Sequence, residues 1–97
     1  MNVRWTQTAR GHLRAIRAYI AQDSPKHVTG MVERIMRRTQ QIAEFPLSGR
    51  QVPEYFVPQV REVIEGPYRL IYHVEPDQLT VLAVVHAARD IQPVEPE

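Results

Sequence analysis

The chain has 97 residues, of which 43% are hydrophobic and 24% are charged, which is enough for one domain with a single modest core. It contains no cysteine, and this excludes disulfide bonds, thiolate metal sites and thiol nucleophiles. The first ten residues are polar and the longest apolar run, residues 81–85, is too short to span a membrane. We therefore expect neither a signal peptide nor a membrane segment, and a cytoplasmic protein.

The net charge of +1 conceals an uneven distribution along the chain. Residues 1–50 carry nine Lys or Arg against three Asp or Glu, a net charge of +6, whereas residues 51–97 carry three against eight, a net charge of −5. Eleven of the twelve basic residues are arginine, whose planar guanidinium suits carboxylates and phosphates. The basic half predicts an acidic partner, either protein or nucleic acid; the alternative is a solvated helical surface balanced by acidic loops.

The first half of the chain predicts a short strand and two helices. Residues 2–5 alternate weakly in polarity, although the local sequence does not reveal a pairing partner. Thr6 or Thr8 suits the N-cap of a helix that runs to about Gln22. Its apolar residues have the three-and-four spacing of an amphipathic helix: Ala9, Leu13, Ile16 and Ile20.

Ser24 and Pro25 suit the N-cap and first turn of a second helix, which runs to about Glu44. The predicted buried face of this helix consists of Val28, Met31, Val32, Ile35, Thr39, Ile42 and Ala43. Because the link is so short, we expect an antiparallel helical hairpin over residues 6–45. Neither helix would be stable alone, so both must bury their apolar sides on each other and on a sheet.

Phe45-Pro46 ends the second helix, and residues 46–59 predict an ordered loop. Within this loop, Tyr55, Phe56 and Val57 are apolar enough to tuck onto the core, which we favour over an exposed contact patch. Residues 91–97 form an acidic, proline-bearing tail that we expect to be frayed or extended.

Residues 60–90 are rich in Val, Ile and Tyr and predict three strands, at residues 60–65, 68–75 and 79–86. The breaks between them are too short for a parallel crossover, so we expect an antiparallel meander. The predicted fold is therefore α+β, in the order β-α-α-β-β-β, with an N-terminal helical hairpin packed on a small antiparallel sheet.

Four fragments, in this order and spacing, resemble the RelE/ParE superfamily of bacterial type II toxins. They are WTQTARGHLRAIRAYIAQDSP (residues 5–25), IAEFPLSGRQVPE (42–54), VREVIEGPYRLIYHV (60–74) and VLAVVHAARD (81–90). The resemblance covers nearly the whole chain and implies the same fold, a helical hairpin on a small antiparallel sheet. It also implies a growth-arresting toxin of a plasmid-stabilisation type of module, neutralised by a cognate antitoxin similar to ParD or RelB.

The superfamily divides according to its target. RelE-like members cut messenger RNA in the ribosomal A site, whereas ParE-like members inhibit DNA gyrase and need no nuclease residues. The long first helix and the FP, GR and VPE segments at the exit of the second helix look more ParE-like. The resemblance therefore favours binding to DNA gyrase. A ribosome-dependent endoribonuclease and an inactive, antitoxin-binding relative are the alternatives.

If the chain is a nuclease, the resemblance places Arg69 where family members bind phosphate, and His86 and Arg89 where they carry C-terminal catalytic groups. Metal-free RNA cleavage needs a base, an acid and charge stabilisation, and histidine titrates near neutral pH. The sequence departs from the family pattern, because no lysine follows Lys26 and no tyrosine follows Tyr72. The lysine-rich set and the C-terminal tyrosine of RelE are therefore absent.

Each candidate residue also has a structural interpretation. Arg69 could pair with Glu62 across the hairpin, His86 could be a core-edge histidine, and Arg89 could pair with Asp90.

For partner binding we predict the arginines of the helical hairpin: Arg10, Arg14, Arg17, Arg34 and Arg38. The alternative for the stripe on the first helix is an ordinary solvated face. The four histidines, at positions 12, 27, 73 and 86, have no metal-ligand spacing, so we expect no metal and no cofactor.

Overall fold

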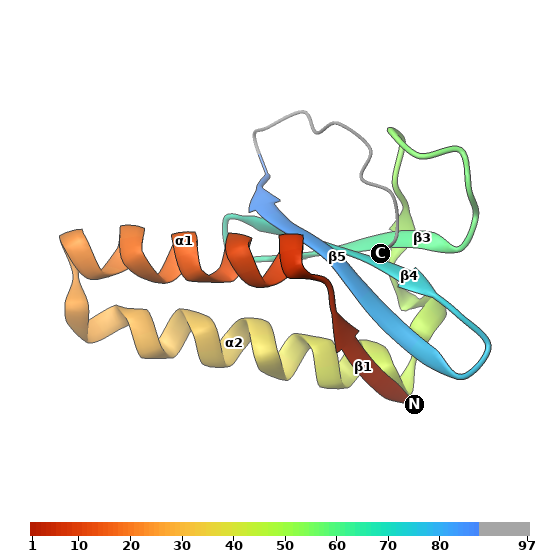
Figure 1. Ribbon diagram of the computed structural model, residues 1–97, viewed down its shortest axis with the longest axis horizontal. Helices are drawn as coiled ribbons and strands as arrows, with labels where there is room; N and C mark the ends of the chain where they lie inside the picture. The colour runs from red at the N-terminus through yellow and green to blue at the C-terminus, as the bar shows by residue number, and fades with distance from the viewer. Residues whose placement is uncertain (88–97) are drawn as a thin grey trace.

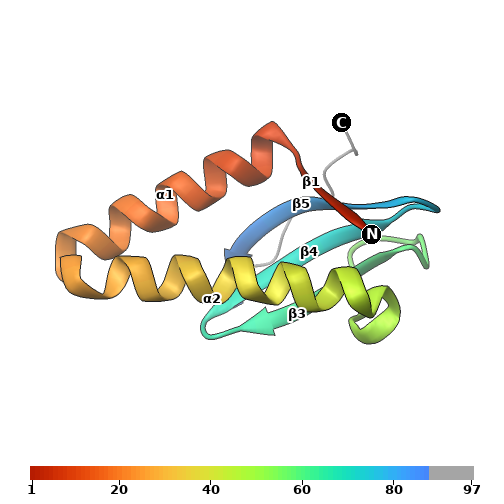
Figure 2. The ribbon, with the colours of Figure 1, turned by 90° about the horizontal axis from the view of Figure 1, so that it is seen from below.

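The computed structural model describes residues 1–87, apart from the side chains of residues 25 and 27–29, and two helices lie against one face of a five-stranded sheet (Figures 1 and 2). The elements in chain order are β1 (Asn2–Trp5), α1 (Gln7–Asp23), α2 (Pro25–Glu44), the 3-10 helix η1 (Pro46–Ser48), β2 (Arg50–Gln51), β3 (Val60–Glu65), β4 (Tyr68–Val74) and β5 (Gln78–His86). The predicted α+β class and helical hairpin are confirmed. The predicted tail at residues 91–97 lies outside the described residues.

The strand order in the sheet is β1-β5-β4-β3-β2. Strands β2 to β5 pair in antiparallel fashion, as predicted for the three longer ones, but β1 lies parallel to β5, with Asn2 opposite Gln78. The sheet is therefore mixed rather than wholly antiparallel, because β1 joins it through a strand far away in the sequence. The predicted loop at residues 46–59 also contains two short elements, η1 and β2, which the sequence did not indicate.

Thr6 connects the start of α1 to the sheet. Its hydroxyl accepts a hydrogen bond from the backbone N–H of Ala9 at 3.0 Å, which caps the helix, and donates to the carbonyl oxygen of Leu82 at 3.4 Å. The backbone N–H of Thr6 also donates to the carbonyl oxygen of Val81 at 3.1 Å. These bonds therefore fix where the first helix begins relative to the middle of β5.

The core consists of two apolar clusters, one on each face of the sheet. The cluster on the helix side joins residues of α1 and α2 to β3, β4 and β5: Ala9, Ile16, Ile35, Ile42, Val63, Tyr68, Leu70, Tyr72, Leu79, Val81 and Val84. The cluster on the far face consists of Val52, Val60, Ile71, Leu82 and Ala83. A register shift between β4 and β5 lets both Leu82 and Ala83 join the far-face cluster.

Tyr72 attaches the segment after α2 to the sheet. Its hydroxyl donates to the carbonyl oxygen of Pro46 at 2.9 Å and accepts from the backbone N–H of Gly49 at 3.0 Å. A β-carbon on Gly49 would collide with this hydroxyl and would lie 2.6 Å from the carbonyl oxygen of Glu62, so the chain can approach this closely only at a glycine. Burial raises the pKa of Tyr72, which keeps the hydroxyl protonated as a donor.

The two β-turns of the meander are also held by specific residues. Gly66, between β3 and β4, has a φ of 58°, which favours glycine. Between β4 and β5, Glu75 accepts hydrogen bonds from the Thr80 hydroxyl at 2.5 Å and from the Gln78 amide at 2.8 Å. These two bonds hold the pKa of Glu75 below its usual value. Within residues 1–87, no helix is both long and apolar enough to cross a membrane.

Candidate functional site

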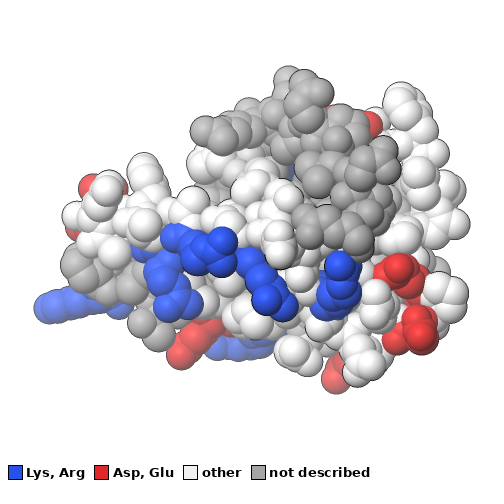
Figure 3. Space-filling view, viewed as in Figure 1, with Lys and Arg blue, Asp and Glu red and all other residues white. Residues whose placement is uncertain are grey.

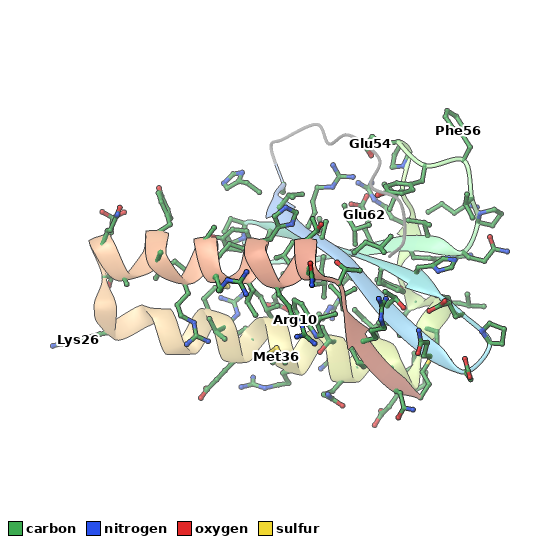
Figure 4. All side chains as sticks on the ribbon, viewed as in Figure 1. Arg10, Lys26, Met36, Glu54, Phe56 and Glu62 are labelled. Atoms are coloured by element: carbon green, nitrogen blue, oxygen red, sulfur yellow. The ribbon has the colours of Figure 1, made fainter. Side chains whose placement is uncertain are left out.

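Arg69, on β4, lies between the carboxylates of Glu54 and Glu62, two residues that Figure 4 labels. Its Nε donates to Oε1 of Glu62 at 2.6 Å, and its Nη1 and Nη2 donate to the two carboxylate oxygens of Glu54 at 2.9 Å each. Arg50 donates from Nε to the other oxygen of Glu62 at 2.8 Å. We call these four residues, Arg50, Glu54, Glu62 and Arg69, the charge cluster.

The charge cluster is mostly buried. Glu62 is 1% exposed and Arg69 is 6% exposed, whereas the side chain of Arg50 is 68% exposed. Two arginines and two glutamates sum to zero charge, and each of the three guanidinium nitrogens of Arg69 donates to a carboxylate. The hydrogen bonds to Glu54, assisted by those to Glu62, raise the pKa of Arg69 above its usual range despite its burial. Arg69 is therefore a charged group whose hydrogen bonds join β4 to β3 and to the segment that carries Glu54.

The predicted ion pair between Arg69 and Glu62 is confirmed, and the strand register explains it. Ile64 lies opposite Arg69, so Glu62, two residues earlier on β3, is on the same face and diagonal to it. Sequence reasoning missed Glu54 and Arg50 as partners. They reach the cluster only because residues 46–59 fold back against β3, and no local pattern in that segment indicates this path.

His86, at the end of β5, lies on the opposite face of the sheet from Arg69. It pairs in register with Tyr68, and the two rings pack edge to face with their centroids 6.2 Å apart. Arg69 is opposite Val85 instead, so its side chain points away from the helices whereas His86 lies on their side. The structure therefore does not bring these two candidates together, and Arg89 lies outside the described residues. A catalytic role for the three residues stays a prediction.

An open pocket of about 540 Å³ lies between α1 and the ends of β4 and β5. It is lined by apolar side chains of both layers together with His12, Tyr19, Tyr68 and His86. The backbone N–H of Val84 donates to Nδ1 of His12 at 3.2 Å, so this nitrogen is an acceptor. His86 is exposed, and its ring packs on Tyr68 of the helix-side cluster, as a histidine at the edge of the core would. Within the described part of the chain, no three His, Asp or Glu residues gather closely enough to hold a metal ion.

The arginines predicted for partner binding divide into two groups. Arg10, Arg14 and Arg17 are exposed along α1, and among residues 1–87 no carboxylate pairs with them. Figure 3 shows the corresponding band of basic side chains along α1. We call these three residues the α1 arginine ridge. Arg34 instead pairs with Glu65 at 2.9 Å, and Arg38 donates to Gln41 at 3.2 Å.

The loop between β2 and β3 corrects one prediction. Tyr55 packs against the far-face cluster as expected, but Phe56 is 97% exposed and Val57 is 43% exposed. The prediction that Phe56 tucks onto the core is therefore wrong. Glu54 and Tyr55 both turn toward the sheet, and the next side chain then points into solvent (Figure 4).

Residues 3–91 match the family described as the ParE toxin of the type II toxin–antitoxin system parDE. The chain belongs to this toxin family. It is also 35% identical, over 86 residues, to Toxin RelE2 of Caulobacter vibrioides, in an alignment that covers 88% of this chain and 93% of the relative.

Solved structures share the fold of this toxin. A chain of the chromosomal ParDE TA system from P. aeruginosa has a TM-score of 0.74 at 22% identity, covering 89% of this chain and 95% of that one. A chain of the toxin–antitoxin complex RelBE2 from Mycobacterium tuberculosis has a TM-score of 0.56 at 23% identity, covering 88% and 95%. Relatives named after both ParE and RelE are thus similar to it, so the names alone do not distinguish a target.

The charge cluster predicts a large difference between two arginine substitutions. Replacing Arg69 with Met leaves the buried carboxylate of Glu62 without its closest partner, which costs on the order of 3–5 kcal/mol of the free energy of unfolding. Replacing Arg50 with Met removes an exposed partner of the same carboxylate and costs less than about 1 kcal/mol. Urea unfolding of the two variants measures both values. Equal, small losses would contradict a structural role for Arg69.

Proposed function

We propose that this toxin arrests growth by binding DNA gyrase and stalling the enzyme while its DNA is cleaved, and that a cognate antitoxin protein holds it inactive. In this proposal the toxin acts in the cytoplasm and acts through its surfaces, with no catalytic centre of its own. Membership of the ParE family and the fold shared with a ParDE toxin support a ParE-type target.

The observation that most supports the proposal is that Glu54 and Glu62 accept hydrogen bonds from all three guanidinium nitrogens of Arg69. A phosphate-binding arginine must direct its N–H groups at the phosphate, and a phosphate would meet two carboxylates here. Coulomb repulsion between those carboxylates and a phosphate opposes RNA binding at this position. His86 lies on the other face of the sheet, which also argues against a nuclease centre that combines it with Arg69. An acid or base must lie near the phosphate on which it acts.

Ribosome-dependent cleavage of messenger RNA is the second candidate, and His86 is the observation that favours it. This histidine is exposed at an open pocket that also contains Tyr19 and Tyr68. Its ring could exchange a proton with a substrate bound there. Burial raises the pKa of Tyr68, with a smaller contribution from Tyr19, so Tyr68 would serve as a hydrogen-bond donor in such a site rather than as a base.

A gyrase assay with purified, antitoxin-free protein separates the two candidates. We expect inhibition of supercoiling with accumulation of cleaved, linear DNA, while messenger RNA in a translation extract stays intact. His86→Ala should then arrest growth as the unmodified toxin does, because the gyrase proposal assigns no catalytic role to this exposed side chain. Substitution of Arg69 is unsuitable for this purpose, since its loss destabilises the fold.

The matched control is His73→Ala, which removes the other histidine of the sheet. Cleaved messenger RNA, together with loss of growth arrest in the His86 variant alone, would overturn the gyrase proposal in favour of the nuclease. A folded protein that arrests no growth would instead identify an inactive relative that only binds its antitoxin.

We also propose that the α1 arginine ridge contacts an acidic surface of the antitoxin. Arg10, Arg14 and Arg17 follow the spacing of one helix face and have no carboxylate partner among residues 1–87. The α2 arginines are less suited to the same role, because Arg34 already pairs with Glu65.

Charge reversal tests the ridge directly. The double variant Arg14→Glu/Arg17→Glu should bind the antitoxin more weakly than the unmodified toxin, with a larger loss at low salt, because screening weakens interactions between exposed charges. Lys26→Glu/Arg37→Glu makes the same change of net charge at two other exposed positions and serves as the control. Equal losses in the two double variants, measured by calorimetric titration, would show a general effect of net charge instead of a docking surface.

A further inference from the structure

The loop between β2 and β3 exposes a phenyl ring almost completely. Phe56 is 97% exposed, and its neighbour Val57 is 43% exposed. Figure 4 shows Phe56 at the outer tip of this loop, away from both helices. Single exposed apolar residues are common on protein surfaces, so exposure alone assigns no role. The way in which the loop is held gives this residue its significance.

Backbone hydrogen bonds close the loop at its base and within its length. The N–H of Val52 donates to the carbonyl oxygen of Val60 at 3.3 Å, and that of Val60 donates to Val57 at 3.1 Å. The N–H of Tyr55 donates to the carbonyl oxygen of Val52 at 3.1 Å. Pro53 and Pro58 flank the exposed residues and restrict the backbone further. The loop is therefore short, closed and stiff.

Three side-chain contacts fix the loop to the sheet. Glu54, inside the loop, accepts hydrogen bonds from both terminal nitrogens of Arg69. The side chain of Tyr55 packs on the far-face cluster. At the other end, Arg61 on β3 donates from Nε to the carbonyl oxygen of Pro58 at 3.2 Å. A loop fixed on both sides of Phe56 presents its phenyl ring in one orientation before any partner arrives.

We infer that Phe56 is the anchor residue through which this toxin engages its target, inserting its phenyl ring into an apolar pocket on a protein. This inference rests on the proposed function, in which the toxin acts by binding, and it adds the contact that makes the binding. An aromatic ring on a stiff loop contributes a large apolar area to an interface and loses little conformational entropy when it is buried. Such residues dominate the binding energy of many interfaces.

The surroundings of the ring favour a protein over a nucleic acid as the partner. Phe56 is followed by Val57, an aliphatic residue that offers no flat face to a base. The carboxylate of Glu54, two residues before Phe56 in the same loop, would repel a phosphate that approached the ring. The arginines of the α1 ridge, with which no carboxylate pairs among residues 1–87, belong to the other layer of the molecule.

The charge cluster then has a role in positioning. Arg69 and Glu54 touch no partner themselves in this account, but they determine where the phenyl ring points. Weakening their contact should loosen the loop and raise the entropic cost of binding. This role would explain why Arg69, in the middle of the sheet, donates two hydrogen bonds to Glu54 of the loop.

Phe56→Ala is a clean test, because the side chain is exposed and its removal leaves the core intact. The matched control is Phe45→Ala, which removes a phenyl ring that is 67% exposed at the end of α2. Growth arrest in cells, gyrase binding and antitoxin binding are measured for the two variants and the unmodified toxin. We expect Phe56→Ala to lose growth arrest and to bind gyrase about tenfold more weakly or worse, with antitoxin binding unchanged.

The readouts separate failure of the inference from failure of the proposed function. An unmodified toxin that arrests growth but binds no gyrase would overturn the gyrase proposal, and growth arrest by Phe56→Ala would then still decide the role of Phe56. Normal arrest by this variant, or an equal loss in Phe45→Ala, would overturn the inference. So would a loss confined to antitoxin binding.

A double-mutant cycle tests the positioning role. Glu54→Gln should weaken target binding less than Phe56→Ala does, and it should have no further effect when Phe56 is already Ala. Additive losses in the double variant would contradict positioning and would assign Glu54 an independent effect.

Discussion

The engagement of Arg69 by Glu54 and Glu62 is the interaction on which the outer face of this toxin depends. A buried carboxylate and a buried guanidinium are each costly alone and become tolerable only as a hydrogen-bonded set. The charge cluster therefore joins three segments that must arrive together: β3, β4 and the loop that carries Glu54. The contacts that secure this loop also direct all three guanidinium nitrogens of Arg69 at carboxylates.

Much of the fold follows from local sequence pattern. The apolar spacing of α1, the Ser24-Pro25 break and the Val- and Ile-rich strands each contain the information for their own structure, and their bounds are close to those predicted. The family resemblance could likewise be recognised from short fragments. Two features were not predictable, because they depend on contacts between distant segments: the parallel pairing of β1 with β5 and the insertion of η1 and β2 into the predicted loop.

The candidate site shows the same division. Pairing of Arg69 with Glu62 is a diagonal contact in one hairpin, and the hairpin register can be derived from the sequence. The contact of Glu54 with Arg69 and the exposure of Phe56 depend on how a proline-containing loop folds back on the sheet. From sequence alone, an apolar residue in such a loop is more readily predicted to be buried in the core. Arg69 and His86 lie on opposite faces of the sheet because of the strand register and because side chains alternate between faces along a strand. A comparison of sequence motifs alone does not reveal this separation.

The most direct test of the account is to observe the Arg69 guanidinium itself, by NMR of the arginine Nε–H groups in free toxin at neutral pH. We predict that the Nε–H of Arg69, which donates to the buried carboxylate of Glu62, exchanges slowly with water and keeps its chemical shift when an RNA oligonucleotide is added. Rapid exchange with water, together with a shift that grows as RNA is titrated in, would contradict the account. That result would show an arginine available to phosphate.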